Sequence, residues 1–164
     1  RRSVMTDQIT SARLQLEPLR TDHAAEMLSV LSDPELYTFD GGQVPTMADL
    51  DRRYAALVAG SGDAAEQWLN WIVRETASGN PVGYVQATIE PAQTEVAWVI
   101  GVPWQGKGYA SEAAQAMKGW LTAQGAAPLV AWIHVEHVAS HKVAQAAGLE
   151  LTDEVDEDGE YAWR

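Results

Sequence analysis

One stretch constrains this chain more than any other: residues 105–110, which read QGKGYA. The apolar run before it, residues 96–100, is short, β-branched and aromatic, and therefore predicts a buried strand. The segment after it, residues 110–124, carries apolar residues at helical spacing, and Gly125 follows where a helix typically ends. A strand, a glycine loop and a helix in this order direct free backbone N–H groups at one spot, which suits a phosphate or a pyrophosphate.

The loop matches neither of the common nucleotide-binding patterns. It lacks the third glycine and the acidic ribose contact of a dinucleotide fingerprint, and Gly108 follows Lys107 where a P-loop has Ser or Thr. A strand-to-helix turn that uses glycines for close packing explains the same residues equally well. Taken alone, the loop therefore leaves an anion site and a packing turn as equal alternatives.

Composition limits the possible classes of protein. The 164 residues are 46% apolar, enough to bury the core of one domain, and no run of 18 apolar residues predicts a membrane span. The lack of cysteine excludes disulfides and thiolate chemistry and agrees with a cytoplasmic location, which we expect. The net charge of −12 argues against nucleic-acid binding. It is compatible with a cationic substrate such as an amine, and equally with a role in solubility alone.

Residues 1–10 carry no pattern, and we expect them to be disordered or a remnant of expression, with one domain in residues 11–164. Periodicity and turn residues predict the order β-α-α-β-β-β-α-β-α-β-β. The expected strands are residues 14–18, 68–74, 82–89, 95–100, 129–135, 149–151 and 160–163, and the expected helices are 21–31, 46–60, 110–124 and 137–147. The three central strands should form an antiparallel meander, and the strands on either side of the third helix should be parallel neighbours. The predicted class is α+β, with a mixed, mostly antiparallel sheet and helices on both faces.

This order of elements, together with the loop, resembles the GNAT acetyltransferase superfamily. The family's acyl-CoA loop reads Gln/Arg-x-x-Gly-x-Gly/Ala, and Gln105, Gly108 and Ala110 fill its three defined positions. The residues that flank the loop resemble the branch of ribosomal-protein N-terminal acetyltransferases, called RimJ/RimL-like. The resemblance covers residues 11–164.

A second motif lies one strand and one helix downstream. Residues 137–149, with His137, Ser140 and Val143, resemble that branch's Asn-x-x-Ser-x-x-Val…Gly-Phe segment at the same spacing. Two residues depart from the family pattern. His137 stands where the family usually has Asn, and Ala144 stands where many members have a Tyr that protonates the departing thiolate.

The resemblance implies an enzyme that transfers an acetyl group from acetyl-CoA to a primary amine by direct attack. The amine would be a protein N-terminus or a small molecule, with cationic acceptors among the candidates, and no metal, nucleic acid or membrane is implied. A monomer and a homodimer are both open. The alternatives are a CoA-binding sensor or interaction module without catalysis, and a scaffold whose loop stays empty.

The resemblance also assigns site residues. The backbone of Ile100 and Val102 would pair with the pantetheine arm, and the loop would hold the pyrophosphate. The implied cofactor-binding residues are Ile100, Val102, Gln105, Gly106, Lys107, Gly108, Tyr109, Ala110, His137 and Ser140. Lys107 would add charge near a phosphate, although a solvated lysine is nearly as good an interpretation.

Three residues are candidates for catalysis. Glu95 begins the third meander strand, where the family often has a carboxylate base, and the alternative is an exposed charge at a strand end. Ser140 would bond the pantetheine or donate toward the sulfur, or else satisfy local backbone. His137 would contact CoA or act as an acid or base, or else cap a helix. Glu136 is a weaker base candidate.

Other polar residues are interpreted more simply. His134 is expected to be core or lining, and His23 and His141 are expected on the surface. The acidic run in residues 153–160 is a solvated hairpin that, given the resemblance, also borders the acceptor.

Overall fold

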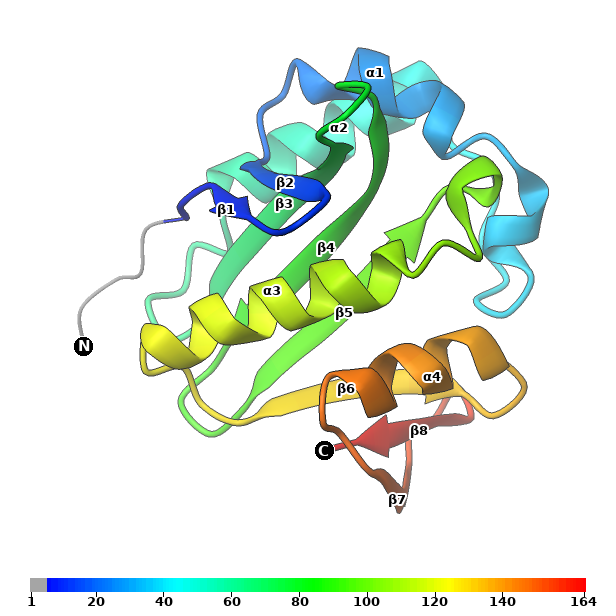
Figure 1. The fold of residues 1–164 in the computed structure, drawn as a ribbon. Helices are drawn as coiled ribbons and strands as arrows, with labels where there is room; N and C mark the ends of the chain where they lie inside the picture. The colour runs from blue at the N-terminus through cyan, green and yellow to red at the C-terminus, as the bar shows by residue number, and fades with distance from the viewer. Residues whose placement is uncertain (1–5) are drawn as a thin grey trace.

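The computed structural model describes residues 6–164 and shows one open sheet with helices on both faces (Figure 1). The strands are β1 (Ile9–Thr10), β2 (Leu14–Pro18), β3 (Gln67–Glu75), β4 (Pro81–Ile89), β5 (Thr94–Ile100), β6 (Leu129–His134), β7 (Leu151–Val155) and β8 (Glu160–Trp163). The helices are α1 (His23–Val30), α2 (Met47–Ala59), α3 (Tyr109–Ala123) and α4 (Val138–Ala146), with 3₁₀ turns η1 (Pro34–Tyr37) and η2 (Val102–Trp104). The predicted α+β class and mostly antiparallel sheet are confirmed. None of the helices in residues 6–164 is long and apolar enough to cross a membrane.

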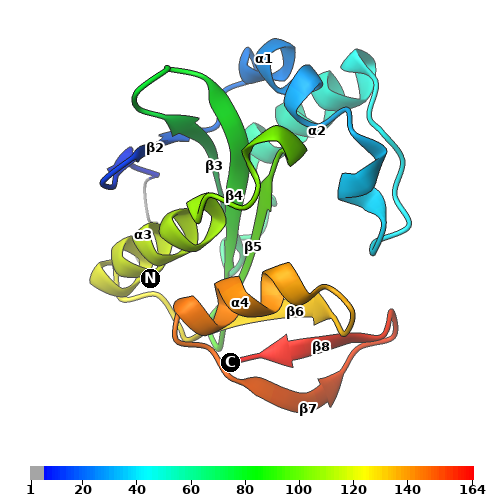
Figure 2. The ribbon, with the colours of Figure 1, turned by 45° about the vertical axis from the view of Figure 1, so that its right-hand side comes forward.

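The sheet has eight strands in the order β1-β2-β3-β4-β5-β6-β8-β7. Strands β1 to β5 are antiparallel neighbours, as are β6, β8 and β7. Strands β5 and β6 are parallel, as the helical connection predicts, but they pair only at Thr94–Leu129 and Glu95–Val130. Beyond these pairs the two strands diverge and leave a V-shaped gap in the backbone pairing of the sheet, which is called the opening below (Figure 2).

The core lies in two layers because side chains alternate along each strand. On one face, Trp71 and Val73 of β3 pack in a cluster with Met117 of α3. On the other face, Ile72 packs with Met27 of α1 and with residues of α2. Three consecutive residues of β3 are therefore buried, which explains why the sequence of this strand alternates only weakly.

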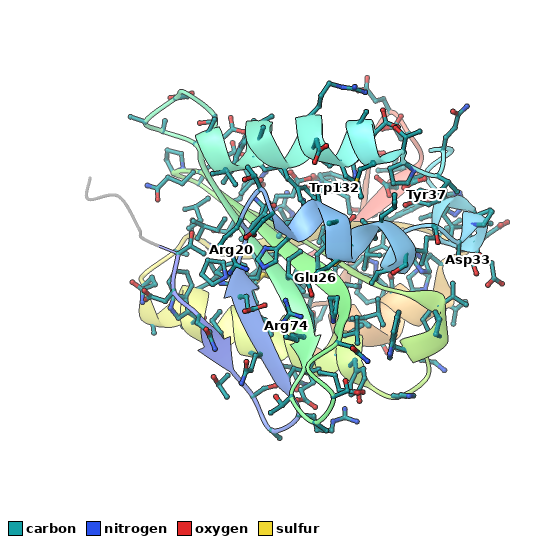
Figure 3. All side chains as sticks on the ribbon, turned by 90° about the horizontal axis from the view of Figure 1, so that it is seen from above. Arg20, Glu26, Asp33, Tyr37, Arg74 and Trp132 are labelled. Carbon is teal, nitrogen blue, oxygen red and sulfur yellow. The ribbon has the colours of Figure 1, made fainter. Side chains whose placement is uncertain are left out.

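Polar contacts define the start of α2 and hold α1 against the sheet. At the start of α2, Thr46 and Asp49 form a reciprocal capping box, in which each side chain accepts a backbone N–H of the other residue. In contrast, α1 has no side-chain cap and begins at His23, two residues after the expected Thr21. Arg74 of β3 pairs with Glu17 at 2.6 Å and with Glu26 of α1 at 2.9 Å (Figure 3). This charge network links α1 to two strands.

Three expectations differ from the structure. Residues 9–10, expected to lack structure, form β1, because Ile9 is buried in the core and Ile9 pairs with Leu16. The expectation for residues 1–5 lies outside the described residues. His23, expected on the surface, is wholly buried, with its Nδ1 accepting the N–H of Arg20. Strand β7 covers residues 151–155 rather than 149–151, because the Asp156 carboxylate accepts two backbone N–H groups and starts the turn there.

Candidate active site

The glycine loop joins η2 to α3 and presents a row of free backbone donors. Gly106 and Gly108 have φ values of 78° and 81°, a backbone conformation that favours glycine. The first N–H bonded within α3 is that of Glu112, which donates to the carbonyl of Gly108. Within residues 6–164, no partner is found for the N–H groups of residues 106–111. These donors and the positive end of the α3 dipole together form a site suited to an anion.

The side chains of the loop mostly serve its shape. Gln105 Nε2 donates to the carbonyl of Ile100 at 2.9 Å, and this bond ties the loop to the end of β5. Tyr109 is buried, and its hydroxyl donates to the Glu75 carboxylate. Lys107 is exposed, and Ala110 lies in the first turn of α3. The loop residues are therefore available to a ligand chiefly through their backbone N–H groups and the Lys107 ammonium.

A chain of polar side chains crosses the opening between β5 and α4. The Trp98 indole N–H donates to Ser140 Oγ at 3.3 Å, and Ser140 Oγ lies 3.3 Å from His137 Nε2. An indole N–H can only donate, so Ser140 accepts this bond and keeps its own hydrogen for another partner. Ser140 is only 8% exposed, so the position of this hydroxyl is well defined. Trp98 was not a candidate from the sequence, because an apolar strand gives no sign of a contact 42 residues away.

His137 is held in place by a ring contact from a distant loop. Its ring stacks on Phe39, with centroids 4.6 Å apart and planes 18° apart, and Phe39 also lies 5.4 Å from the His134 ring. Burial lowers the pKa of His137, and the neighbouring His141 and His134 lower it further, which leaves the imidazole uncharged at neutral pH. His137 occupies the N-cap position of α4, but its side chain makes no capping bond. Its ring contacts Phe39 and the Ser140 side chain rather than the free backbone N–H groups at the start of α4.

A second group of residues lies on the face of β6 and β8 opposite α4. Glu160 pairs with His134 across these strands. Partial burial raises the pKa of Glu160, and the carboxylates of Asp156 and Asp158 raise it further. Glu160 is thus a carboxylate with a raised pKa, and it lies beside His134, whose ring contacts Phe39. The sequence did not single it out, because it lies within an acidic run that has the composition of a solvated hairpin.

Glu95 lies at the other end of the opening, where β5 and β6 separate. Glu95 is an exposed residue. Partial burial of the carboxyl group nevertheless raises the pKa of Glu95, and the carboxylates of Glu90, Asp156 and Glu66 raise it further. The structure shows no hydrogen bond from Glu95 to His137 or Ser140 among the residues it describes. The predicted catalytic residues therefore form two groups, with His137 and Ser140 in contact and Glu95 apart from them.

Comparison with solved structures supports this architecture. The chain superposes on a GNAT-family acetyltransferase from Bacillus anthracis with a TM-score of 0.77 and 21% identity, covering 96% of each chain. Aminoglycoside acetyltransferase AAC(6′)-Ib, in complex with coenzyme A, gives a TM-score of 0.75 and 18% identity over 92% of this chain and 94% of that one. RimL, an α-N-acetyltransferase of a ribosomal protein, was also solved in complex with coenzyme A. It gives a TM-score of 0.77 and 16% identity over 96% of this chain and 94% of that one. At these identities the likeness concerns the fold.

Sequence comparison identifies the family. No curated protein matches the chain. A family model described as an acetyltransferase (GNAT) domain matches residues 13–150, which include the glycine loop, the opening of the sheet and helix α4. With this match and the free N–H groups at the start of α3, the chain belongs to the GNAT acetyltransferase family.

Proposed function

We propose that this protein transfers the acetyl group of acetyl-CoA to a primary amine on a cationic acceptor. The observation that carries the proposal is the row of free N–H groups in residues 106–111 beside the V-shaped opening of the sheet. The family match supports acetyl-CoA as the donor. The RimJ/RimL-like branch, suggested by the residues around the loop, forms part of this proposal.

In this proposal the cofactor lies along residues from both predicted motifs. The pyrophosphate binds the N–H groups of residues 106–110, with Lys107 supplying charge. The pantetheine arm extends along the edge of β5 that β6 leaves unpaired, beside Ile100 and Val102. The thioester then reaches Ser140 and His137, which the structure brings within hydrogen-bonding distance of each other.

The chemistry needs a neutral amine and a stabilised leaving group. A carboxylate base takes a proton from the amine, whose nitrogen attacks the thioester carbon, and the C–S bond then breaks. Glu95 and Glu160 are the candidate bases, because a raised pKa moves a carboxylate toward the working range of a base near neutral pH. The Ser140 hydroxyl is free to donate toward the departing sulfur, because in its bond with Trp98 the Ser140 oxygen only accepts.

The acceptor side of the opening carries carboxylates that raise the pKa of Glu95 and Glu160. Asp156 raises the pKa of both residues, and Asp40 raises that of Glu160. This repulsion indicates a negative potential that attracts a positively charged acceptor. The folds compared above include enzymes that act on an aminoglycoside and on a ribosomal protein, and both kinds of amine are candidates here.

The test is release of free thiol from acetyl-CoA in the presence of a panel of amines. The panel should pair each polycationic amine with a neutral amine of similar size. We expect acceleration by the cationic members, with a rate that falls as salt screens the attraction. Acceleration by no amine would contradict the proposal. Calorimetric binding of CoA without turnover would instead support a binding module, which Ala144 in place of a tyrosine acid also permits.

A further inference from the structure

We infer that Arg13, which lies outside both family motifs, is a second cation for the phosphates of coenzyme A. The inference rests on the proposed use of the glycine loop and adds a residue from the turn between β1 and β2. Arg13 lies 94 residues before Lys107 in the sequence, and its Nη1 donates to the Lys107 carbonyl at 2.8 Å. A residue of the N-terminal hairpin thus lies against the loop.

Contacts with Glu112, Lys107 and Tyr109 fix the Arg13 side chain in one orientation. Its Nε donates to Glu112 Oε1 at 2.7 Å, and its backbone N–H donates to Glu112 Oε2 at 2.8 Å. The guanidinium carbon lies 4.6 Å from the centre of the Tyr109 ring, a cation–π contact. Ser11 Oγ also donates to Glu112 at 2.6 Å. An arginine held in this way loses little further freedom when it binds a ligand.

One end of the guanidinium stays available beside the loop. Nη2 has no hydrogen bond in the part of the chain that the structure describes. A Cβ placed on Gly108 would lie 3.4 Å from Nη2, so this group borders the loop directly. The side chain is 47% exposed, and a phosphate can therefore reach it. Arginine offers parallel donors that match phosphate oxygens.

The charges around the glycine loop make Arg13 necessary for attracting the phosphates of coenzyme A. Arg13 and Lys107 both interact electrostatically with Glu75, and Arg13 interacts with Glu112. The two cations balance the two carboxylates. Without Arg13, the region around the loop would carry a net negative charge and repel the phosphates of the cofactor. Glu112 lies in the first turn of α3, so its charge would act close to the phosphate site.

The experiment compares CoA binding by calorimetry in wild type, Arg13→Gln, Arg13→Lys, Glu112→Gln and Arg52→Gln. Arg52 is an exposed arginine on α2 paired with Asp49, and its variant controls for net charge. We expect Arg13→Gln to weaken binding about tenfold, as is typical for loss of a charge-assisted hydrogen bond, with Arg13→Lys in between. Arg52→Gln should bind as wild type does.

Glu112→Gln separates a direct contact from a purely structural one. The substitution breaks the ion pair that holds Arg13 but removes a negative charge from the phosphate site, so binding should stay equal or become tighter. If Glu112→Gln and Arg13→Gln weaken binding equally, Arg13 acts only through the shape of the loop and the inference is overturned. Unchanged binding by Arg13→Gln overturns it as well.

Ligands with fewer phosphates supply the second criterion. S-acetyl-pantetheine has no phosphate, so Arg13→Gln and wild type should have the same kcat/KM with this substrate. If Arg13→Gln lowers kcat/KM for S-acetyl-pantetheine as much as for acetyl-CoA, the inference is overturned. Dephospho-CoA, which lacks the 3′-phosphate, identifies the phosphate that Arg13 contacts. If Arg13→Gln still binds dephospho-CoA more weakly than wild type does, Arg13 contacts the diphosphate. If the two proteins bind it equally, Arg13 contacts the 3′-phosphate. Failure of wild type to bind CoA would contradict the proposed function itself, whereas binding without an Arg13 effect would contradict only this inference.

Discussion

At the scale of single residues, Ser140 has the most defined chemical environment in the opening. It is buried, it accepts the Trp98 N–H, and its hydrogen is free for His137 or for a ligand. The uncharged imidazole of His137 is a suitable acceptor while no cofactor is bound. The same hydroxyl is then ready to turn toward a leaving sulfur.

Replacement of Ser140 by Ala should therefore lower kcat by about a hundredfold, the usual contribution of a positioned proton donor. Affinity for CoA should change much less, because the backbone of the loop supplies most of the binding. Trp98→Phe keeps a ring but removes the N–H, and should lower kcat about fivefold, as expected for one neutral hydrogen bond. Steady-state kinetics checks both variants, and a Ser140→Ala enzyme with wild-type kcat would remove Ser140 from the chemistry.

The two carboxylates with raised pKa can be distinguished by their pH profiles. A base must be deprotonated, so the rate should rise with pH through the raised pKa of the residue that serves. Substitution of that residue by Gln should remove this rise from the pH–rate profile. The rate should then increase with pH only as the amine itself loses its proton. Glu95→Gln and Glu160→Gln are each other's controls. A profile unaltered in both variants would show that neither is the base.

At the scale of elements, β4 and β5 approach each other closely at the end of β5. Gly83 of β4 pairs with Ile100 of β5. A Cβ at Gly83 would lie 2.1 Å from the carbonyl oxygen of Val99 and 2.9 Å from the Cα of Ile100. The backbone of β5 must therefore move if any side chain is introduced there. The same part of β5 leads directly into the glycine loop.

Gly83→Ala should lower the free energy of unfolding by about 1–3 kcal/mol, the usual cost of overpacking, and should also weaken CoA binding through the displaced strand. Gly119 is the matched control. It lies within α3, and a Cβ there meets nothing within 4 Å. Gly119→Ala should stabilise the protein by about 0.5–1 kcal/mol. Urea denaturation measures both, and a neutral Gly83→Ala would contradict the packing shown here.

Elements were predictable from the sequence where their signals are local. The capping box of α2 and the helix after the glycine loop depend on residues within a few positions of one another. Strand β1 was missed because two residues carry no periodicity, and Ile9 is buried only through its pairing with β2. His23 was misplaced for a similar reason, since it becomes buried only when α1 packs on the sheet, where its Nε2 lies 3.7 Å from Glu17 of β2.

At the scale of the whole molecule, buried histidines couple stability to pH. His23 Nε2 lies 3.7 Å from Glu17 and has no hydrogen-bond partner within residues 6–164. Burial lowers the pKa of His23, and the charge of Arg20 lowers it further. The unfolded chain therefore binds this proton more readily than the folded one. The stabilising effect is complete above the ordinary histidine pKa of about 6.5 and is lost as the pH falls below it.

We accordingly expect a lower free energy of unfolding at about pH 5.5 than at about pH 7.5, with the midpoint of the loss below the ordinary histidine pKa of about 6.5. His23→Asn retains an acceptor for the Arg20 N–H but cannot gain this charge, so the dependence on pH should shrink. His137 contributes in the same direction and accounts for part of what remains. Urea denaturation at the two pH values provides the test. An identical dependence in the variant would exclude His23 as a source.

The sequence by itself determined the order of the strands and α-helices from β2 onward, the parallel crossover and the glycine loop, because each depends on residues that are close along the chain. Only the tertiary structure decided which side chains meet at that loop and at the opening. Arg13 contacts Glu112 across 99 residues, and Trp98 contacts Ser140 across 42. Phe39 reaches His137 from the connection between α1 and α2. Such contacts depend on how the strands register and diverge, and this geometry exists only once the sheet has formed.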